Sequence, residues 1–331
     1  MKNLLLIGLS ILLFSACSTK RVFEPDDTDD WKKQGSLNSS LVEIGSNVAL
    51  LEDKNILSKN DINDASEVTI AENFSLLSSS NGWISSANID GNLTLQYIHE
   101  ASVTENFALK KTVAAASVKG NILAVLFADN DIALYSIASK ELLFKDNVGE
   151  TIAIDARITS PYFTGNLVIF STLNGKVVIV NSKSLKKLRT ITVSSEDNFN
   201  NILYFNLIDD KIIAGTSHKI LAMSKNEVRK KYEIRNIAYE NEDIFIATKQ
   251  GELISLTTDL ELNAKLKFPF AHFLGLIVKD EQVYALEKEG YLIVAPHDLS
   301  TFKVYDVDID EGLVFVSDDT FFVDDAYVSV K

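Results

Sequence analysis

The chain has 331 residues, of which 46% are hydrophobic, and this length suits one large all-β domain or two smaller domains. Its single cysteine and four prolines exclude a disulfide-stapled or proline-rich design. The formal net charge is −14, and removal of residues 1–16, whose one charge is on Lys2, would leave −15. Such an acidic chain is a poor match for nucleic acid and anionic lipid headgroups, because both bind clustered Lys and Arg.

The first residues have the pattern of a targeting segment. Lys2 forms a short basic region, and Leu4–Phe14 is an apolar run too short to span a bilayer as a mature helix. The run ends in LFSAC, with small residues directly before Cys17, and this resembles the lipobox of bacterial lipoproteins, in which the cysteine becomes lipid-modified. The alternative is a free, buried cysteine near the end of an ordinary signal peptide.

The lipobox resemblance implies three regions of the chain and a cellular location. Residues 1–16 would be the lipoprotein signal peptide, residues 17–40 the lipidated Cys17 with an acidic tether, and residues 41–331 the folded domain. Ser18 resembles the outer-membrane sorting signal of enteric-type bacteria, so we expect a lipid-anchored, periplasm-facing protein of the outer membrane. The remainder contains no apolar run near the ~20 residues that a transmembrane helix needs.

The segment Asn166–Arg189 contains the clearest unit of a pattern that the rest of the chain repeats. Two short apolar runs rich in β-branched residues, Leu167–Phe170 and Val177–Val180, flank Asn174-Gly175, which is a strong hairpin signal. Neither run alternates polar with apolar residues, and such runs are typical of strands covered on both faces. This segment therefore predicts a hairpin that lies between two other layers.

The same pattern recurs along the chain. Six clear copies lie 33 to 45 residues apart, with turns at Gly91, Asn130, Gly175, His218, Gly251 and Gly290. Two weaker copies surround Lys54 and Asp319, which gives eight hairpins. A charged loop and a further apolar segment follow many of the turns, so each repeat predicts a four-stranded unit of roughly forty residues.

A four-stranded sheet with two apolar faces must stack against copies of itself, because it cannot bury both faces alone. Radial closure of such sheets gives a β-propeller, whereas a linear solenoid usually has a shorter period. We therefore expect an all-β protein, a β-propeller with eight blades favoured and seven left open. Residues such as Leu41–Leu51 could complete the last sheet so that no open edge remains.

The pattern from Ile169 to Leu188 resembles the repeat of the pyrroloquinoline-quinone-type β-propeller family. Joined to the lipobox, it is similar to the BamB-like outer-membrane assembly lipoproteins. The resemblance implies a non-enzymatic scaffold that binds periplasmic domains of the central barrel-assembly protein and helps outer-membrane β-barrels to insert. No stretch matches the partner-binding loops of that family closely enough to transfer a residue.

The chain departs from the family repeat where a tryptophan often closes the unit. Other apolar residues stand there and would fill the same packing role: Phe144, Leu188, Tyr232, Leu266 and Phe302. The calcium ligands, stacking tryptophan and adjacent cysteines of quinone-dependent relatives are missing from the sequence, so we expect no cofactor and no enzymatic activity.

Candidate metal ligands and modification sites are few and each has a simpler explanation. The histidines His99, His218, His272 and His297 lack metal-ligand spacing, and His218 suits a turn. Asp306, Asp308 and Asp310 suggest a calcium loop, but Glu311 and Ser317 replace the glycine and glutamate of an EF-hand. These aspartates favour instead a strand with an acidic edge that deters pairing.

Two further alternatives stay open. Asp90-Gly91-Asn92-Leu93-Thr94 resembles a bacterial glycosylation sequon centred on Asn92, although a turn alone explains these residue types. The propeller could also bind a ligand or glycan, with hydrolysis as an extension, or it could serve another envelope complex. A ligand-binding channel would gather several carboxylates or histidines at its mouth.

Overall fold

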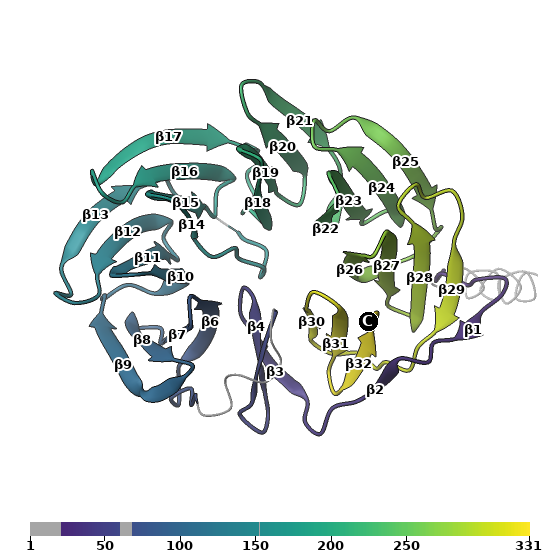
Figure 1. Cartoon of the computed structure of the whole chain (residues 1–331), viewed down its shortest axis with the longest axis horizontal. Coiled ribbons are helices and arrows are strands. Elements are labelled where there is room, and N and C mark those ends of the chain that lie inside the picture. Colours follow the sequence, from purple (N-terminus) through teal and green to yellow (C-terminus); the bar gives the residue numbers. More distant parts are fainter. Residues whose placement is uncertain (1–20, 60–67, 152) are drawn as a thin grey trace, which may run out of the picture.

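The computed structural model describes residues 21–59, 68–151 and 153–331, and Cys17 lies outside the described residues. Within these ranges the chain consists of strands without helices, and the strands form eight sheets arranged in a ring (Figure 1). The expected all-β class and the eight-bladed β-propeller are thereby confirmed. No helix long and apolar enough to cross a membrane occurs in the described part of the chain.

We number the blades 1 to 8 in chain order, which is also their order around the ring. Blade 1 contains β3 (Leu41–Ile44), β4 (Val48–Leu51) and β5 (Ile56–Ser58), and blade 2 contains β6 (Ser75–Ser80), β7 (Trp83–Ala87), β8 (Asn92–Tyr97) and β9 (Glu100–Ala108). Blade 3 contains β10 (Val113–Lys119), β11 (Ile122–Phe127), β12 (Asp131–Ser136) and β13 (Leu142–Asn147). Blade 4 contains β14 (Tyr162–Thr164), β15 (Leu167–Ser171), β16 (Lys176–Asn181) and β17 (Lys186–Thr192).

The second half of the ring continues the same arrangement and takes up two strands from the N-terminal segment. Blade 5 contains β18 (Tyr204–Ile208), β19 (Lys211–Gly215), β20 (Lys219–Met223) and β21 (Glu227–Lys231), and blade 6 contains β22 (Ile234–Glu240), β23 (Asp243–Thr248), β24 (Glu252–Thr257) and β25 (Leu262–Lys267). Blade 7 contains β26 (Phe273–Lys279), β27 (Gln282–Glu287), β28 (Tyr291–Pro296) and β29 (Lys303–Asp306), with β1 (Asp29–Asp30) at its edge. Blade 8 contains β30 (Val314–Val316), β31 (Thr320–Val323) and β32 (Ala326–Ser329), with β2 (Gln34–Ser36) as its fourth strand.

The hairpin that serves as the sequence template is the central pair of blade 4. β15 and β16 pair antiparallel, with Leu167 opposite Asn181 and Ser171 opposite Val177. Gly175 adopts φ +76°, and a Cβ there would lie 2.5 Å from the carbonyl oxygen of Ser194. The turn therefore needs glycine both for its backbone conformation and for the close approach of the following loop.

The other turns follow the expected pattern with one difference. Gly91, Asn130, His218, Gly251, Gly290 and Lys54 lie between the second and third strands of their blades, as Gly175 does. Asp319 instead lies between β30 and β31, the first two strands of blade 8. The central pair of that blade turns at Asp324-Asp325, so the eighth hairpin exists but joins a different pair of strands than we expected.

The hydrophobic core is divided among the contacts between neighbouring blades. Eight clusters of buried residues each join two consecutive blades, including blades 8 and 1. In β15, for example, Val168 and Phe170 face blade 3, whereas Ile169 packs toward blade 5. This two-sided burial explains the uninterrupted apolar runs of the central strands.

The N-terminal segment closes the ring in a way that the sequence did not indicate. β2 pairs antiparallel with β32 and completes blade 8, whereas Leu41–Leu51, the segment we expected there, forms β3 and β4 of blade 1. We expected the acidic edge at Asp306 to be unpaired, but β1 pairs in parallel with β29 and covers it. Residues within the expected tether 17–40 thus contribute strands to the propeller.

Trp31 fastens this closing segment. Its ring makes edge contacts with Tyr284 and Tyr305 of blade 7, and its Nε1 donates a hydrogen bond to the carbonyl oxygen of Ser329 (2.9 Å). The side chain therefore joins the N-terminal segment to the last two blades at once. Aromatic contacts of this kind add to the burial of apolar surface.

We predict that Trp31→Ala lowers the free energy of unfolding by about 3 kcal/mol, because it removes a large, partly buried ring and a hydrogen bond at the closure. Urea denaturation followed by circular dichroism measures the change. Lys33→Ala is the control, since this side chain is exposed in the same segment. Equal midpoints for the two variants would contradict a role of Trp31 in closure.

Candidate functional site at the mouth of the central channel

One end of the propeller carries the turns between second and third strands together with the connections between blades. We call this end the turn face. The antiparallel order of each blade places the start of its innermost strand at the same end. The turn face therefore surrounds one mouth of the central channel.

A segment of blade 4, which we call the strap (residues 153–160), crosses this channel. It precedes the short inner strand β14, and Figure 1 shows it running from β14 into the middle of the ring. Its backbone follows the connection between blades 4 and 5: the amide of Phe199 donates to the carbonyl oxygen of Ala153 (2.9 Å). Across the channel, the amide of Ser160 donates to Oγ of Ser46 in blade 1 (3.1 Å).

Asn201 holds the middle of the strap. Its Oδ1 accepts from the amide of Asp155 (2.7 Å), and its Nδ2 donates to the carbonyl oxygens of Asp155 (3.2 Å) and Arg157 (2.7 Å). One buried amide side chain thereby satisfies three backbone groups of a segment that lacks regular structure. Such satisfaction fixes the strap over the mouth, because unpaired backbone groups there would be costly.

Asp155 and Arg157 form a bidentate ion pair on the strap. Nε of Arg157 donates to Oδ1 of Asp155 (2.8 Å) and Nη2 donates to Oδ2 (2.7 Å). Burial alone would raise the pKa of Asp155, but hydrogen bonds from Arg157 and the charges of Arg157 and Lys249 hold that pKa below its usual value. The third donor, Nη1 of Arg157, bonds the backbone oxygen of Arg235 in blade 6.

Arg235 occupies a position that other blades fill with apolar residues. The innermost strands of five blades carry a β-bulge near their start, and the extra residues are Val42, Leu77, Ala114, Arg235 and Leu274. A bulge redirects a side chain out of the regular alternation. In blade 6 alone among these five, the bulge therefore directs a cation to the mouth of the channel.

The guanidinium of Arg235 has unused hydrogen-bonding capacity. Nε donates to the carbonyl oxygen of Phe273 on β26 (3.1 Å), whereas its two terminal nitrogens make no hydrogen bond or ion pair with the residues that the structure describes. Burial and the neighbouring charge of Arg157 lower the pKa of Arg235, which Asp155 partly opposes. Since Asp155 is already bonded to Arg157, Arg235 has no carboxylate of its own in the part of the chain that the structure describes.

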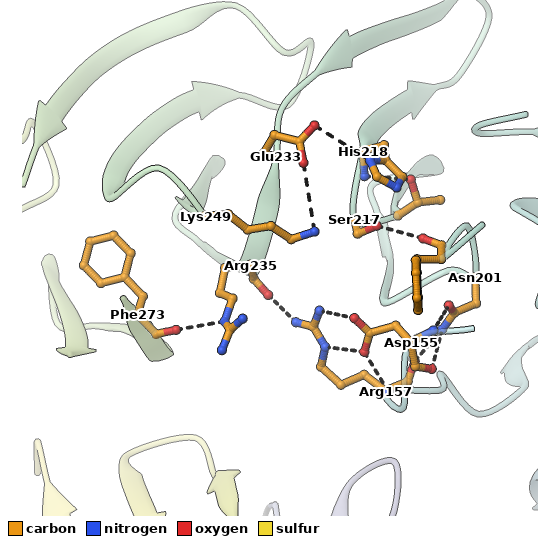
Figure 2. A network of polar contacts seen from close by, with 11 residues as sticks. Asp155, Arg157, Asn201, Ser217, His218, Glu233, Arg235, Lys249 and Phe273 are labelled. Atoms are coloured by element: carbon orange, nitrogen blue, oxygen red, sulfur yellow. Dashed lines mark hydrogen bonds and ion pairs between the residues drawn. The ribbon is translucent and has the colours of Figure 1, made fainter. Parts of the chain in front are cut away.

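Figure 2 shows that Arg235 lies on one side of Arg157 and Asp155 on the other. Above them, Lys249 approaches Glu233 (4.0 Å), and Nδ1 of His218 lies 3.8 Å from the same carboxylate. This group contains the three cationic side chains Arg157, Arg235 and Lys249 and two carboxylates, in a chain of net charge −14. The mouth is thus locally positive and suits an anionic group.

A cavity of about 400 Å³ lies between the inner strands of blades 5 to 8. Its polar lining includes Tyr204, Asn206 and Asn236, and Oδ1 of Asn236 is buried without a hydrogen-bond partner among the described residues. Burial raises the pKa of Tyr204 to about 12, so its hydroxyl stays neutral. The charged groups of the lining are Lys59 and Asp318, whose nearest atoms lie 4.0 Å apart.

The structure separates the four histidines. His99 packs against Tyr97, His218 lies at the turn of blade 5, His272 follows blade 6, and Nε2 of His297 lies 2.8 Å from Oε2 of Glu240. The described residues contain no group of three or more His, Cys, Asp or Glu that could hold a metal ion. His218 does occupy the turn that the sequence indicated.

The other sequence candidates lie away from the mouth. Asp306 ends β29 and accepts a hydrogen bond from Oγ1 of Thr28, and the amide of Asp308 donates to Oε1 of Gln34 (2.8 Å). This loop therefore holds the N-terminal segment. Asn92 is exposed at the start of β8, where its amide donates to Oδ1 of Asn88 (2.9 Å), so the residue is accessible for modification.

Two of the residues expected to replace the closing tryptophan do not pack inside. Leu188 and Phe302 are 56% and 50% exposed. Sequence reasoning also missed Arg157 and Arg235, which are 78 residues apart in the chain. A usable signal for Arg235 was its charge near the start of an inner strand, where the equivalent blades have the apolar residues Val42, Leu77, Ala114 and Leu274.

Comparison with known proteins supports the architecture. A family model described as the RSE1/DDB1/CPSF1 second β-propeller matches residues 83–323, which is more than half of the chain. The plasminogen-binding protein PgbB of Helicobacter pylori strain J99 is 34% identical over 207 residues, which cover 61% of this chain and 37% of PgbB. The chain thus spans little more than a third of that relative.

Solved structures share the fold. BamB from Moraxella catarrhalis superimposes with a TM-score of 0.67 at 8% identity, covering 90% of this chain and 98% of that chain. The C-terminal WD40 domain of Sif2 also reaches 0.67, at 10% identity, covering 92% and 99%. The expected resemblance to BamB is therefore confirmed at the level of the fold.

We predict that Arg157→Ala loosens the strap. The loss of a part-buried, charge-assisted pair costs on the order of 1.5–3 kcal/mol, so hydrogen exchange of the Phe199 amide should accelerate at least tenfold. Arg189→Ala, which removes an exposed pair with Glu227, is the control. The pKa of Asp155 in the folded protein is below its usual value. The ion pair therefore contributes its full stabilisation of the strap at pH values above the usual carboxyl pKa, and this stabilisation is lost as the pH falls through the pKa of folded Asp155.

Unchanged exchange at Phe199 in Arg157→Ala would show that backbone contacts alone hold the strap. After correction for intrinsic exchange, protection of this amide in the unmodified protein should also decline as pH falls from the usual carboxyl pKa of about 3.9 through the lower pKa of Asp155 in the folded protein.

Proposed function

This chain belongs to the RSE1/DDB1/CPSF1 second β-propeller family, and we propose that it is a protein-binding scaffold rather than an enzyme. The scaffold is anchored through lipid on Cys17 to the outer membrane, faces the periplasm and takes part in the assembly and insertion of outer-membrane β-barrels. The observation that carries this proposal is the likeness to BamB, which extends over 98% of that chain. The lipobox-like sequence before Cys17 supports the anchor.

The mouth of the channel is the partner-binding site in this proposal. Arg235 is half-buried and its terminal nitrogens lack a carboxylate among the described residues, so an acidic segment of the partner would supply the missing acceptor. Arginine suits this role because its planar guanidinium binds a carboxylate through two parallel hydrogen bonds. Arg157 and Lys249 add to the positive charge that attracts such a segment.

The strap makes this site rigid. Asn201 and the pair Asp155–Arg157 hold it, and the hydrogen bond from Arg157 to the backbone of Arg235 connects the strap with blade 6. A preformed site loses less conformational entropy when a partner binds. The position of Arg235 is thus fixed before the partner arrives.

A ligand- or glycan-binding propeller is the alternative. The cavity of about 400 Å³ has the volume of a small-molecule site, and Tyr204, Asn206 and Asn236 could position a polar ligand. Its lining offers one carboxylate, Asp318, and none of the four histidines. The groups at the mouth that this alternative would use, Asp155 and Glu233 with His218, are already engaged in ion pairs or contacts within the chain. The scaffold proposal therefore accounts better for the residues at the mouth. Service to another envelope complex would use the same site with a different partner.

A second candidate function is binding of plasminogen, because the curated relative PgbB is named for it. That name describes the whole relative, of which the match covers 37%. Direct binding to immobilised plasminogen distinguishes this candidate from the first. Binding of plasminogen without recovery of any barrel-assembly protein would favour it.

The anchor is tested by Cys17→Ser. Because this substitution removes the lipid attachment point, the protein should move from the membrane fraction to the soluble periplasmic fraction. Thr19→Ser, two residues away, is the control and should stay with the membrane. Membrane association that persists in Cys17→Ser would contradict the lipid anchor.

The scaffold function is tested by affinity capture from crosslinked envelope followed by mass spectrometry. The unmodified protein should recover barrel-assembly components, and Arg235→Gln should reduce that recovery at least tenfold, since loss of one partner from a buried charge pair costs 2 kcal/mol or more. Arg189→Gln is the matched control, because its guanidinium is exposed and already paired with Glu227. Recovery of no barrel-assembly protein by the unmodified chain would contradict the proposal.

A further inference from the structure

Two exposed aromatic residues lie near the contact between blades 6 and 7: Phe270 in the connection between these blades, and Phe302 directly before β29. Phe270 and Phe302 are 54% and 50% exposed, although both lie near the buried core residue Phe268. The ring of Phe302 lies 5.0 Å from that of Phe268, and Phe270 follows Phe268 by two residues. We call Phe270 and Phe302, with the adjoining surface, the aromatic rim.

The N-terminal segment is fixed to this rim. Phe23 is buried and makes edge contacts with Phe268 (5.9 Å) and Tyr291 (5.7 Å). The guanidinium of Arg21 lies 5.6 Å above the ring of Phe270. The chain therefore reaches the propeller at the rim, well before the end of the tether that the sequence suggested.

The short distance along the chain limits how far the rim can lie from the lipid. Cys17 precedes Arg21 by four residues, and a fully extended chain covers at most about 3.3–3.6 Å per residue, or about 14 Å in all. The interfacial zone on each side of a bilayer is itself roughly 5–7 Å thick. A lipid on Cys17 would thus hold Phe270 and Phe302 close to the membrane surface.

We propose that the aromatic rim rests on the bilayer to which Cys17 is anchored, with Phe270 and Phe302 inserted among the headgroups. This inference depends on the lipid anchor of the proposed function. Aromatic rings with one face already packed on the protein lose little freedom when the other face enters the interface. The rim therefore fixes the orientation of the propeller relative to the membrane.

The charges beside the rim indicate which bilayer it suits. Arg21 and Lys303 are exposed there, but Glu24, Asp26 and Asp27 are exposed directly after Phe23. These charges largely offset one another, so the contact rests on the aromatic side chains rather than on attraction to anionic headgroups. A zwitterionic bilayer should be sufficient.

The test uses tryptophan as a probe of depth. Phosphatidylcholine vesicles with brominated acyl chains should quench the tryptophan fluorescence of Phe302→Trp. The fluorescence of the unmodified protein, which comes from Trp31 and Trp83, is subtracted first. Ile89→Trp is the matched control: Ile89 is 79% exposed on a turn of blade 2, away from the rim, and a probe there should not be quenched. Adding Phe270→Gln to Phe302→Trp should reduce the quenching at least twofold.

The protein is measured in two forms, so that failure of the rim and failure of the anchor can be told apart. One is the full chain isolated from its own membrane. The other is residues 17–331 with a maleimide phospholipid on Cys17, the single cysteine of the chain. If the isolated protein carries no lipid, the anchor proposal fails, and the second form still tests the rim. Absence of quenching in vesicle-bound Phe302→Trp of the second form would overturn the inference.

Discussion

The structure depends on one constraint, which is that each blade has two apolar faces and must be covered on both. Eight buried clusters satisfy it, each shared by two consecutive blades. Because the burial of apolar surface is the dominant favourable contribution to folding, a blade without its neighbours would lose much of its stability. The ring must therefore close, and the contact between blades 8 and 1 is as necessary as any other.

This division of the core leaves the ends of the strands free to carry charge. The inner strands have only their first residues at the mouth of the channel, and a bulge there can redirect one side chain without disturbing the packing between blades. Blade 6 uses this position for Arg235, where blades 1, 2, 3 and 7 have apolar residues. The strap then brings Arg157 and Asp155 to the same place, so the site arises from a small departure from the repeat.

Closure also determines where the propeller lies relative to its N-terminus. β2 must extend along β32 to complete blade 8, and β1 lies along β29, so the chain enters the ring at blade 7. The rings of Phe23 and Trp31 fix that path by packing against aromatic residues of blade 7 and against Phe268 at the end of blade 6. Trp31 also donates a hydrogen bond to the backbone of Ser329 in blade 8. The strands that protect the edges of the sheets thereby also hold the N-terminal segment on blades 7 and 8 from Phe23 onward.

The sequence by itself determined the strands, most of the turns and the eight repeated units. Apolar runs such as Val177–Val180 and the turn at Asn174-Gly175 depend on interactions within a few residues, which a single sequence displays directly. The stacking of the units follows from their two apolar faces. Cys17 stays a prediction, since it lies outside the described residues.

Tertiary structure alone decided how the ring closes and where the polar site lies. Gln34–Ser36 has no apolar pattern, and its partner β32 is almost 300 residues away, so local sequence could not reveal their pairing. Arg157 and Arg235 meet because blades 4 and 6 face the same channel, and Phe302 remains exposed because the neighbouring blade leaves its outer face uncovered. These features depend on the positions of whole blades, and the short-range pattern of any one blade contains no information about the others.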